Sequence, residues 1–164
     1  MNINSLTSSF KSFFEQQNTT TADYDLSTNL TKRVRSIFKG VKGNHEKLPV
    51  NVESLPAVFV QADTTSFEPN QIGKTSRRDA KINFSIVGVT HQGMGVGDQG
   101  QGRETADMEA LQLANNIEQI IHDNLKMSNT VQWLIVDNSS YDANISDNSY
   151  NSIVEINLKG QVRQ

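Results

Sequence analysis

The sequence predicts an α+β fold: a mostly antiparallel or mixed sheet of about four strands packed against one long helix, with N-terminal helices before it. Residues 79–90 alternate apolar and polar side chains, which is typical of a half-buried strand in such a sheet. Residues 103–126 carry an apolar stripe at helical spacing. The 164 residues suit a single domain. We expect its N-terminal helical part at about 1–45, and its sheet and long helix at about 49–164.

The N-terminal part predicts two helices. In residues 6–14, four apolar side chains recur at the spacing of one helical face. A second helix is expected over about 28–38, where apolar residues follow the same period and Gly40 provides a stop. Its other face would hold the basic residues Lys32, Arg33, Arg35 and Lys39. This basic face is either solvated or in contact with an acidic neighbour or a phosphate backbone.

The remaining elements follow in the order β-β-α-β-β. Residues 57–62 predict a short strand, followed by a polar connection over 63–74 and the alternating strand. A glycine-rich loop over 92–102 leads into the long helix, whose first turns carry acidic residues that complement the helix dipole. After this helix, residues 131–136 predict an apolar strand. A polar loop over 137–151 and a final alternating strand over 152–162 are expected to complete the domain.

The composition excludes several classes of protein. The chain has no cysteine, which excludes a disulfide framework, a thiolate zinc site and a cysteine nucleophile. No run of about 18 apolar residues is present, so we expect no membrane span. The net charge is −3, but residues 1–50 carry seven Lys/Arg against four Asp/Glu, and residues 101–164 carry four against nine. A chain that is basic at one end and acidic at the other has complementary surfaces with which to meet a copy of itself.

Three glycines in the loop, Gly95, Gly97 and Gly100, spell the G-x-G-x-x-G pattern of dinucleotide-binding folds. The strand before them alternates, whereas the first strand of such a fold is buried on both faces and continuously apolar. The acidic residue at the end of the next strand, Asp137, lies well beyond the spacing of about 20 residues that the ribose requires. We therefore interpret the loop as a long tongue that packs against a neighbouring subunit, and we expect no cofactor.

Other constellations give weak signals for chemistry. The three histidines, His45, His91 and His122, lack the helical i, i+4 spacing of a zinc helix, so no metal site is expected. A second basic cluster lies at the entrance to the alternating strand and comprises Lys74, Arg77, Arg78 and Lys81. These charges protect a strand edge from aggregation, contact an acidic subunit, or touch DNA.

Taken together, the segments resemble the tail terminator (tail-completion) proteins of tailed bacteriophages. The resemblance is carried by the helix Leu6 to Phe14, the strand Ala57 to Val60 after its proline, and the alternating strand Ile82 to Val89. The acidic-starting helix Glu104 to Leu125 and the closing strand Ile153 to Leu158 complete it. It covers most of the chain after Leu48. The expected second helix and the glycine-rich loop are not part of it.

The resemblance implies a structural virion protein that is not an enzyme. Its subunits would form a hexameric ring at the head-proximal end of the tail tube, assembled in the host cytoplasm. The implied partners are further copies of the chain, the tail-tube protein and the head-connector or neck proteins, with a passing contact with DNA and none with a membrane. The alternatives are another head–tail connector or neck adaptor, and a small nucleotide-binding domain that uses the glycine-rich loop.

A ring needs two different, complementary faces on each subunit. We expect basic and acidic segments together with the glycine loop to supply them. The candidate interface residues are Lys32, Arg33, Arg35, Lys74, Arg77, Arg78, Lys81, Gly93, Gly95, Gly97, Gly100, Glu104, Asp107 and Glu109.

Overall fold

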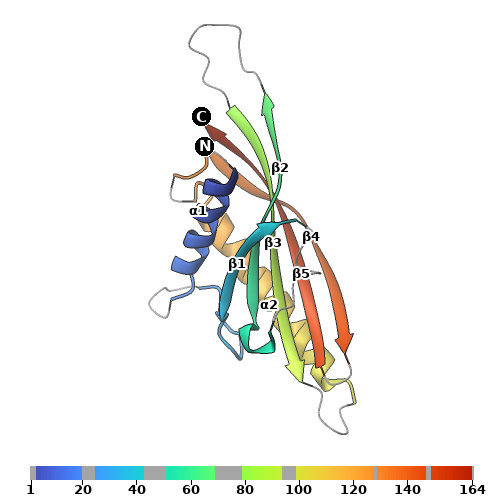
Figure 1. Ribbon diagram of the computed structural model, residues 1–164. Coiled ribbons are helices and arrows are strands. Elements are labelled where there is room, and N and C mark those ends of the chain that lie inside the picture. The colour runs from blue at the N-terminus through green and yellow to red at the C-terminus, as the bar shows by residue number, and fades with distance from the viewer. Residues whose placement is uncertain are drawn as a thin grey trace, which may run out of the picture.

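A computed structural model describes residues 3–19, 25–42, 51–68, 79–93, 99–127, 129–146 and 149–163. Over these residues the chain has an α+β fold with two α-helices and a mixed five-stranded sheet (Figure 1). In chain order the elements are α1 (Ile3–Gln16), β1 (Ser36–Val41), the short 3-10 helix η1 (Val52–Ser54), β2 (Ala57–Glu68), β3 (Asp79–Gly93), α2 (Gln101–Asp123), β4 (Trp133–Ser146) and β5 (Ser149–Arg163).

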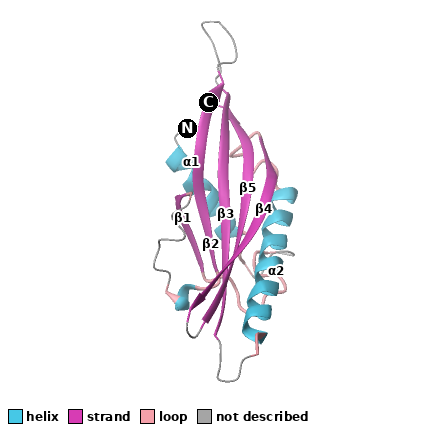
Figure 2. Cartoon of the chain, turned by 90° about the vertical axis from the view of Figure 1, so that its right-hand side faces the viewer, coloured by secondary structure: helices cyan, strands magenta, loops and turns pink. Residues whose placement is uncertain are grey.

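The strands lie in the order β1-β2-β3-β5-β4. β1 is parallel to β2, and every other neighbouring pair is antiparallel. The long strands run the length of the molecule beside α2 (Figure 2), and β1 and β4 form the two margins of the sheet (Figure 1). The sheet therefore has a short edge strand of six residues on one side and a long edge strand of 14 on the other.

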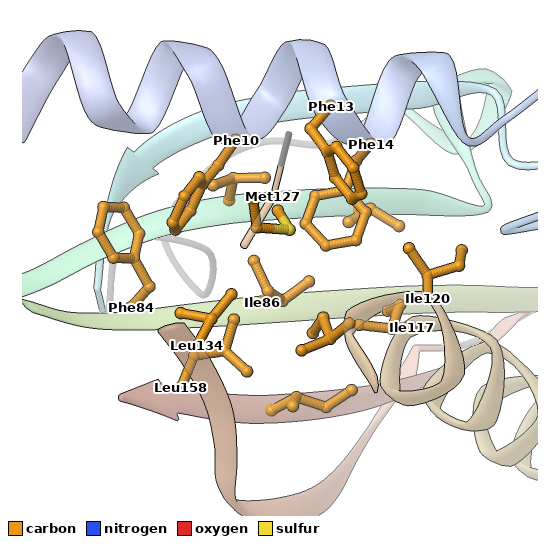
Figure 3. Close-up of a cluster of buried hydrophobic side chains, with 14 of the residues drawn as sticks. Phe10, Phe13, Phe14, Phe84, Ile86, Ile117, Ile120, Met127, Leu134 and Leu158 are labelled. Carbon is orange, nitrogen blue, oxygen red and sulfur yellow. The ribbon is translucent and has the colours of Figure 1, made fainter. Parts of the chain in front are cut away.

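Both helices cover the same face of the sheet, α1 over β1 and β2, and α2 over β3 and β5. The aromatic side chains of α1 point into a cluster that also contains Ile117 and Ile120 of α2 (Figure 3). The rings of Phe10 and Phe84 lie 4.5 Å apart between their centroids. Each fully buried side chain of this size contributes about 1.5–3 kcal/mol of transfer free energy, so this cluster is the main stabilising contact between the helices and the sheet.

The predicted first helix, the alternating strand, the long helix and the closing strand are all present. The long helix begins at Gln101 after Gly100, whose φ of 95° lies in the left-handed region that favours glycine. At Gly88 of β3 the missing side chain leaves room for Leu113 of α2. The apolar stripe read from the sequence is thus the buried face of α2.

The predicted second helix over 28–38 is wrong, because residues 26–29 form turns and β1 begins at Ser36. Polar side chains from elsewhere in the chain form hydrogen bonds with backbone N–H and C=O groups that a helix would pair with one another. The buried Asn116 amide of α2 donates to the carbonyls of Leu26 (2.9 Å) and Thr28 (2.8 Å). The Glu109 carboxylate accepts from the backbone N–H of Thr31 at 3.1 Å. Side chains of the long helix thus hold this segment in an irregular path.

Two predicted polar connections are also wrong in extent. Residues 137–146 continue β4 and pair with β5 in a hairpin, where a loop over 137–151 was expected. Likewise, β2 extends to Glu68, into the segment expected to be a connection from residue 63. From Asp137 to Asp142 the polar residues of β4 are exposed. The apolar alternation that marks a strand is therefore missing there.

Candidate functional site

The second face of the sheet, opposite the helices, carries its own apolar cluster. Phe59, Val87 and Val89 are buried there together with Leu55 and Ala57, and Ile153 packs against them. Phe38 of β1 lies beside this group, with its ring centroid 5.2 Å from that of Phe59. The cluster lies over β1, β2 and β3, on one half of this face.

A polar band crosses the second face from the end of β1 to β4. The Lys42 ammonium donates to Asn157 Oδ1 (2.9 Å) and lies 3.3 Å from Asp63 Oδ2 and 3.6 Å from Glu155 Oε1. The Ser85 hydroxyl donates to the same Glu155 oxygen at 2.8 Å. On the other side, Asn157 Nδ2 donates to Asn138 Oδ1 of β4 at 2.7 Å. This band therefore links the two margins of the sheet through side-chain contacts.

Gln61 of β2 lies beside this band, in register with Ser85. It is only 1% exposed, and within the described part of the chain its side-chain oxygen has no hydrogen-bond partner. An unpaired buried acceptor costs about 1–3 kcal/mol. Among the described residues, the Gln61 side-chain oxygen is the buried side-chain atom that lacks a hydrogen-bond partner.

The edge strand β4 exposes large apolar side chains. Trp133, Ile135 and Tyr141 are 36%, 48% and 53% exposed. A long edge strand with apolar side chains presents both unpaired backbone groups and apolar surface to a partner, and proteins normally blunt such edges. Sequence reasoning missed this feature, because the apolar run over 131–136 predicts a strand without indicating that it lies at the edge of the sheet.

Two grooves flank the first half of α2. One, of about 440 Å³, lies between α2, the C-terminal half of β4 and the first residues of β5. The Arg103 guanidinium lies over the Tyr150 ring there, 5.7 Å from its centroid, and the Ser152 hydroxyl donates to Asp107 at 2.9 Å. The second groove, of about 560 Å³, opens on the other side of α2 and is lined by Glu104 and Glu109. The three predicted acidic residues therefore line neighbouring grooves.

These acidic residues differ in what their carboxylates contact. Glu109 accepts from Thr31 and Asp107 from Ser152, so both carboxylates serve the fold of the chain itself. Glu104 is exposed on the first turn of α2. The predicted acidic face on the long helix is therefore partly used inside the subunit.

The predicted basic residues near β1 lie on the irregular segment before that strand. Arg33 bridges the Asp25 carboxylate at 2.8 Å, and the Arg35 guanidinium donates to the carbonyl of Glu53 at 3.0 Å. Lys32 and Lys81 are both exposed, Lys32 on this segment and Lys81 on β3. The basic residues of the segment are thus brought to the β1 margin, but on an irregular backbone and not on a helix face.

Of the glycine loop, Gly93 ends β3 and Gly100 precedes α2. The other predicted interface residues Lys74, Arg77, Arg78, Gly95 and Gly97 lie outside the described residues, as does His45. A dinucleotide-binding unit requires parallel strands joined by a helix, whereas β3 is antiparallel to both of its neighbours. The topology around the loop therefore does not match that unit.

Among the described residues, no group of three or more His, Asp or Glu side chains is arranged to hold a metal ion. His91 instead pairs with Asn151 across β3 and β5, at 2.7 Å between Nδ1 and Oδ1. Neither described helix has the length and hydrophobicity needed to cross a bilayer. No protein-family model and no curated protein matches the chain.

Proposed function

We propose that this chain is a structural subunit that acts by assembling with copies of itself and with other proteins. The observation that carries the proposal is the edge strand β4, with Trp133, Ile135 and Tyr141 exposed along it. Chains that remain alone cover or blunt such an edge, and chains that assemble use it. The groove between α2 and β4 adds recessed surface next to the same strand.

The specific role we propose is that of a bacteriophage tail terminator. It would form a hexameric ring at the head-proximal end of the tail tube and dock to the neck, as part of the virion. Support comes from the elements on which the resemblance rests: α1, β2, β3, α2 and β5 follow one another in the expected order. Another head–tail connector or neck adaptor shares this support. The antiparallel neighbours of β3 do not favour the nucleotide-binding alternative.

Light scattering and negative-stain microscopy of the purified protein test the proposal. We expect a closed ring with a central opening. A lysine at Ile135 places a charge on the exposed apolar part of β4, so we expect Ile135→Lys to give a smaller particle. Leu125→Lys is the matched control, because Leu125 has a similar exposure, 45% against 48%, but lies in the turn after α2.

The outcomes are distinct. A wild-type ring that Ile135→Lys disrupts and Leu125→Lys preserves would support assembly through β4. A ring unaffected by Ile135→Lys would reject the role of this strand and leave assembly standing. A two-fold dimer would contradict the tail-terminator role, because a two-fold contact closes on itself and builds no ring. A monomer at every concentration would overturn the proposal.

A further inference from the structure

The two margins of the sheet are complementary in charge. Residues 30–42, which contain β1 and the segment before it, hold five Lys/Arg and no acidic residue. The edge strand β4 itself holds two acidic residues, Asp137 and Asp142, and no Lys/Arg. Since β1 and β4 are the opposite edges of the sheet, folding carries the basic segment to one margin and the acidic segment to the other (Figure 1).

Among the described residues, part of this charge has no ion-pair partner within the subunit. Arg35 donates to a backbone carbonyl and Lys39 to the Ser8 hydroxyl at 2.8 Å, and neither acceptor carries a charge. On the opposite margin, Asp142 is exposed and accepts from the backbone N–H of Ala143. By contrast, Asp137 is already paired with Lys159 at 2.9 Å, and Lys42 of the basic segment lies 3.3 Å from Asp63 and 3.6 Å from Glu155 of its own chain. In the part of the chain that the structure describes, the charges without an ionic partner thus include Arg35 and Lys39 at the β1 margin and Asp142 at the β4 margin.

We propose that β4 of one copy pairs with β1 of the next copy, so that the sheet continues from subunit to subunit. This inference rests on the proposed function, because it names the two surfaces through which copies assemble. Opposite charges favour contact between unlike edges, whereas two β1 edges or two β4 edges would place like charges together. The contact is therefore head-to-tail, the type that builds rings, and not a two-fold dimer.

The strand directions fit this arrangement. β1 is parallel to β2, and the antiparallel steps from β2 through β3 and β5 to β4 leave β4 running opposite to β1. A copy rotated about an axis along the strands therefore brings its β1 antiparallel to β4 of its neighbour. Antiparallel pairing is slightly more stable per residue than parallel pairing. The rotation also keeps both helices of each subunit on the same side of the joined sheet.

The chain has no cysteine, so each single-cysteine variant carries one thiol and a disulfide reports one contact. Ser36 and Gly40 of β1 lie on the second face, as do Ser140 and Asp142 of β4, whereas Ser139 lies on the helix face. Opposed residues of an antiparallel pair have Cα atoms about 4.5–5.5 Å apart, within disulfide range. A Cβ at Gly40 meets no atom within 4 Å, and Ser36→Cys is a near-isosteric alternative.

The experiment mixes a tagged β1 variant (Ser36→Cys or Gly40→Cys) with an untagged β4 variant (Ser140→Cys or Asp142→Cys) under mild oxidation. We expect at least one mixed pair to give a disulfide-linked dimer, at a yield roughly tenfold above the mixture with Ser139→Cys, because only thiols on the same face are held together. Each variant alone should stay unlinked, since a head-to-tail contact never places a residue against its own copy. Circular dichroism checks that each variant is folded.

Each result decides. Mixed disulfides with weak Ser139→Cys linkage support β1–β4 pairing. Disulfides within single variants, and not between them, overturn it in favour of two-fold pairing. If the cysteine variants keep the wild-type oligomer by light scattering but no mixed disulfide forms, the pairing is wrong and the assembly function survives. If the wild type itself is monomeric and no disulfide forms, both proposals fail.

Discussion

Gly88 allows α2 to pack closely on β3, and Gly88→Ala tests that packing. A Cβ at this position would lie 2.7 Å from Cδ2 of Leu113 and 3.0 Å from Cγ1 of Val154. Carbon atoms pack best at about 3.5–4.0 Å, so Leu113 or the α2 backbone must move by about 1 Å. Leu113 is fully buried. We therefore expect the free energy of unfolding to fall by about 1–3 kcal/mol through overpacking.

A second substitution separates overpacking from other effects. Leu113→Ala alone should cost about 2–5 kcal/mol, because it leaves a cavity in the core. In the double variant Gly88→Ala/Leu113→Ala the new methyl group no longer meets the leucine side chain. The two losses should therefore not add. We expect the free energy of unfolding of the double variant to be higher, by at least about 1 kcal/mol, than the sum of the two single losses predicts.

Urea denaturation, monitored by far-UV circular dichroism, measures these changes. The protein concentration is chosen so that all variants have the same oligomeric state. In thermal melts the Gly88→Ala loss corresponds to a fall in Tm of about 2–12 °C for a domain of this size. Gly93→Ala is the control, because a Cβ there meets no atom within 4 Å. If Gly88→Ala is as stable as Gly93→Ala, or if the double variant is additive, the close approach of α2 to β3 is refuted.

Asn116→Ala should lower the free energy of unfolding by about 2–3 kcal/mol, because the carbonyls of Leu26 and Thr28 each lose a donor in the interior. Urea denaturation measures this loss. A loss below about 0.5 kcal/mol, as at an ordinary surface site, would contradict the hydrogen bonds assigned to this amide. The double variant Arg77→Glu/Arg78→Glu should weaken ring formation and leave the subunit folded; light scattering with circular dichroism checks both, and an unchanged oligomer mass would remove these arginines from the interface.

The central elements of the fold were predictable because their residues are constrained on two sides. In β3, Ile82, Phe84 and Ile86 face the helices, and the residues between them lie on the second face. This geometry gives the period of two that the sequence displays. In α2 the stripe around Ile117 packs on the sheet, and the opposite side is wet. An element that is buried on one face and exposed to solvent on the other has a clear hydrophobic periodicity in its sequence.

The β1 margin was misread for an identifiable reason. Ile37 and Phe38 were assigned to one helix face, but in β1 they point to opposite faces of the sheet. Ile37 packs against the main core, and Phe38 lies over Phe59. Only six residues form this strand, too few for a period of two to stand out from a helical one. The side chains that hold the preceding turn in place, such as Asn116, are distant in sequence and gave no local signal.

The candidate site was partly visible in the sequence. The uneven distribution of charge along the chain was evident, but which charges remain exposed depends on the fold. The carboxylates of Asp107 and Glu109 were predicted to form an intersubunit face and contact Ser152 and Thr31 of their own chain. Such pairings join residues 45 and 78 positions apart in sequence. They depend on how α2 is placed against the sheet, which no local pattern records.

The elements whose patterns were hardest to interpret are the two edges of the sheet, β1 and the second half of β4. An edge strand has a neighbour on one side only, so packing within the subunit restricts its residues less than those of a central strand. From Asn138 to Ala143 the β4 side chains are exposed on both faces, and no alternation remains. What these margins do keep is a single sign of charge each. Such a separation favours the pairing of unlike edges between copies over the pairing of like edges.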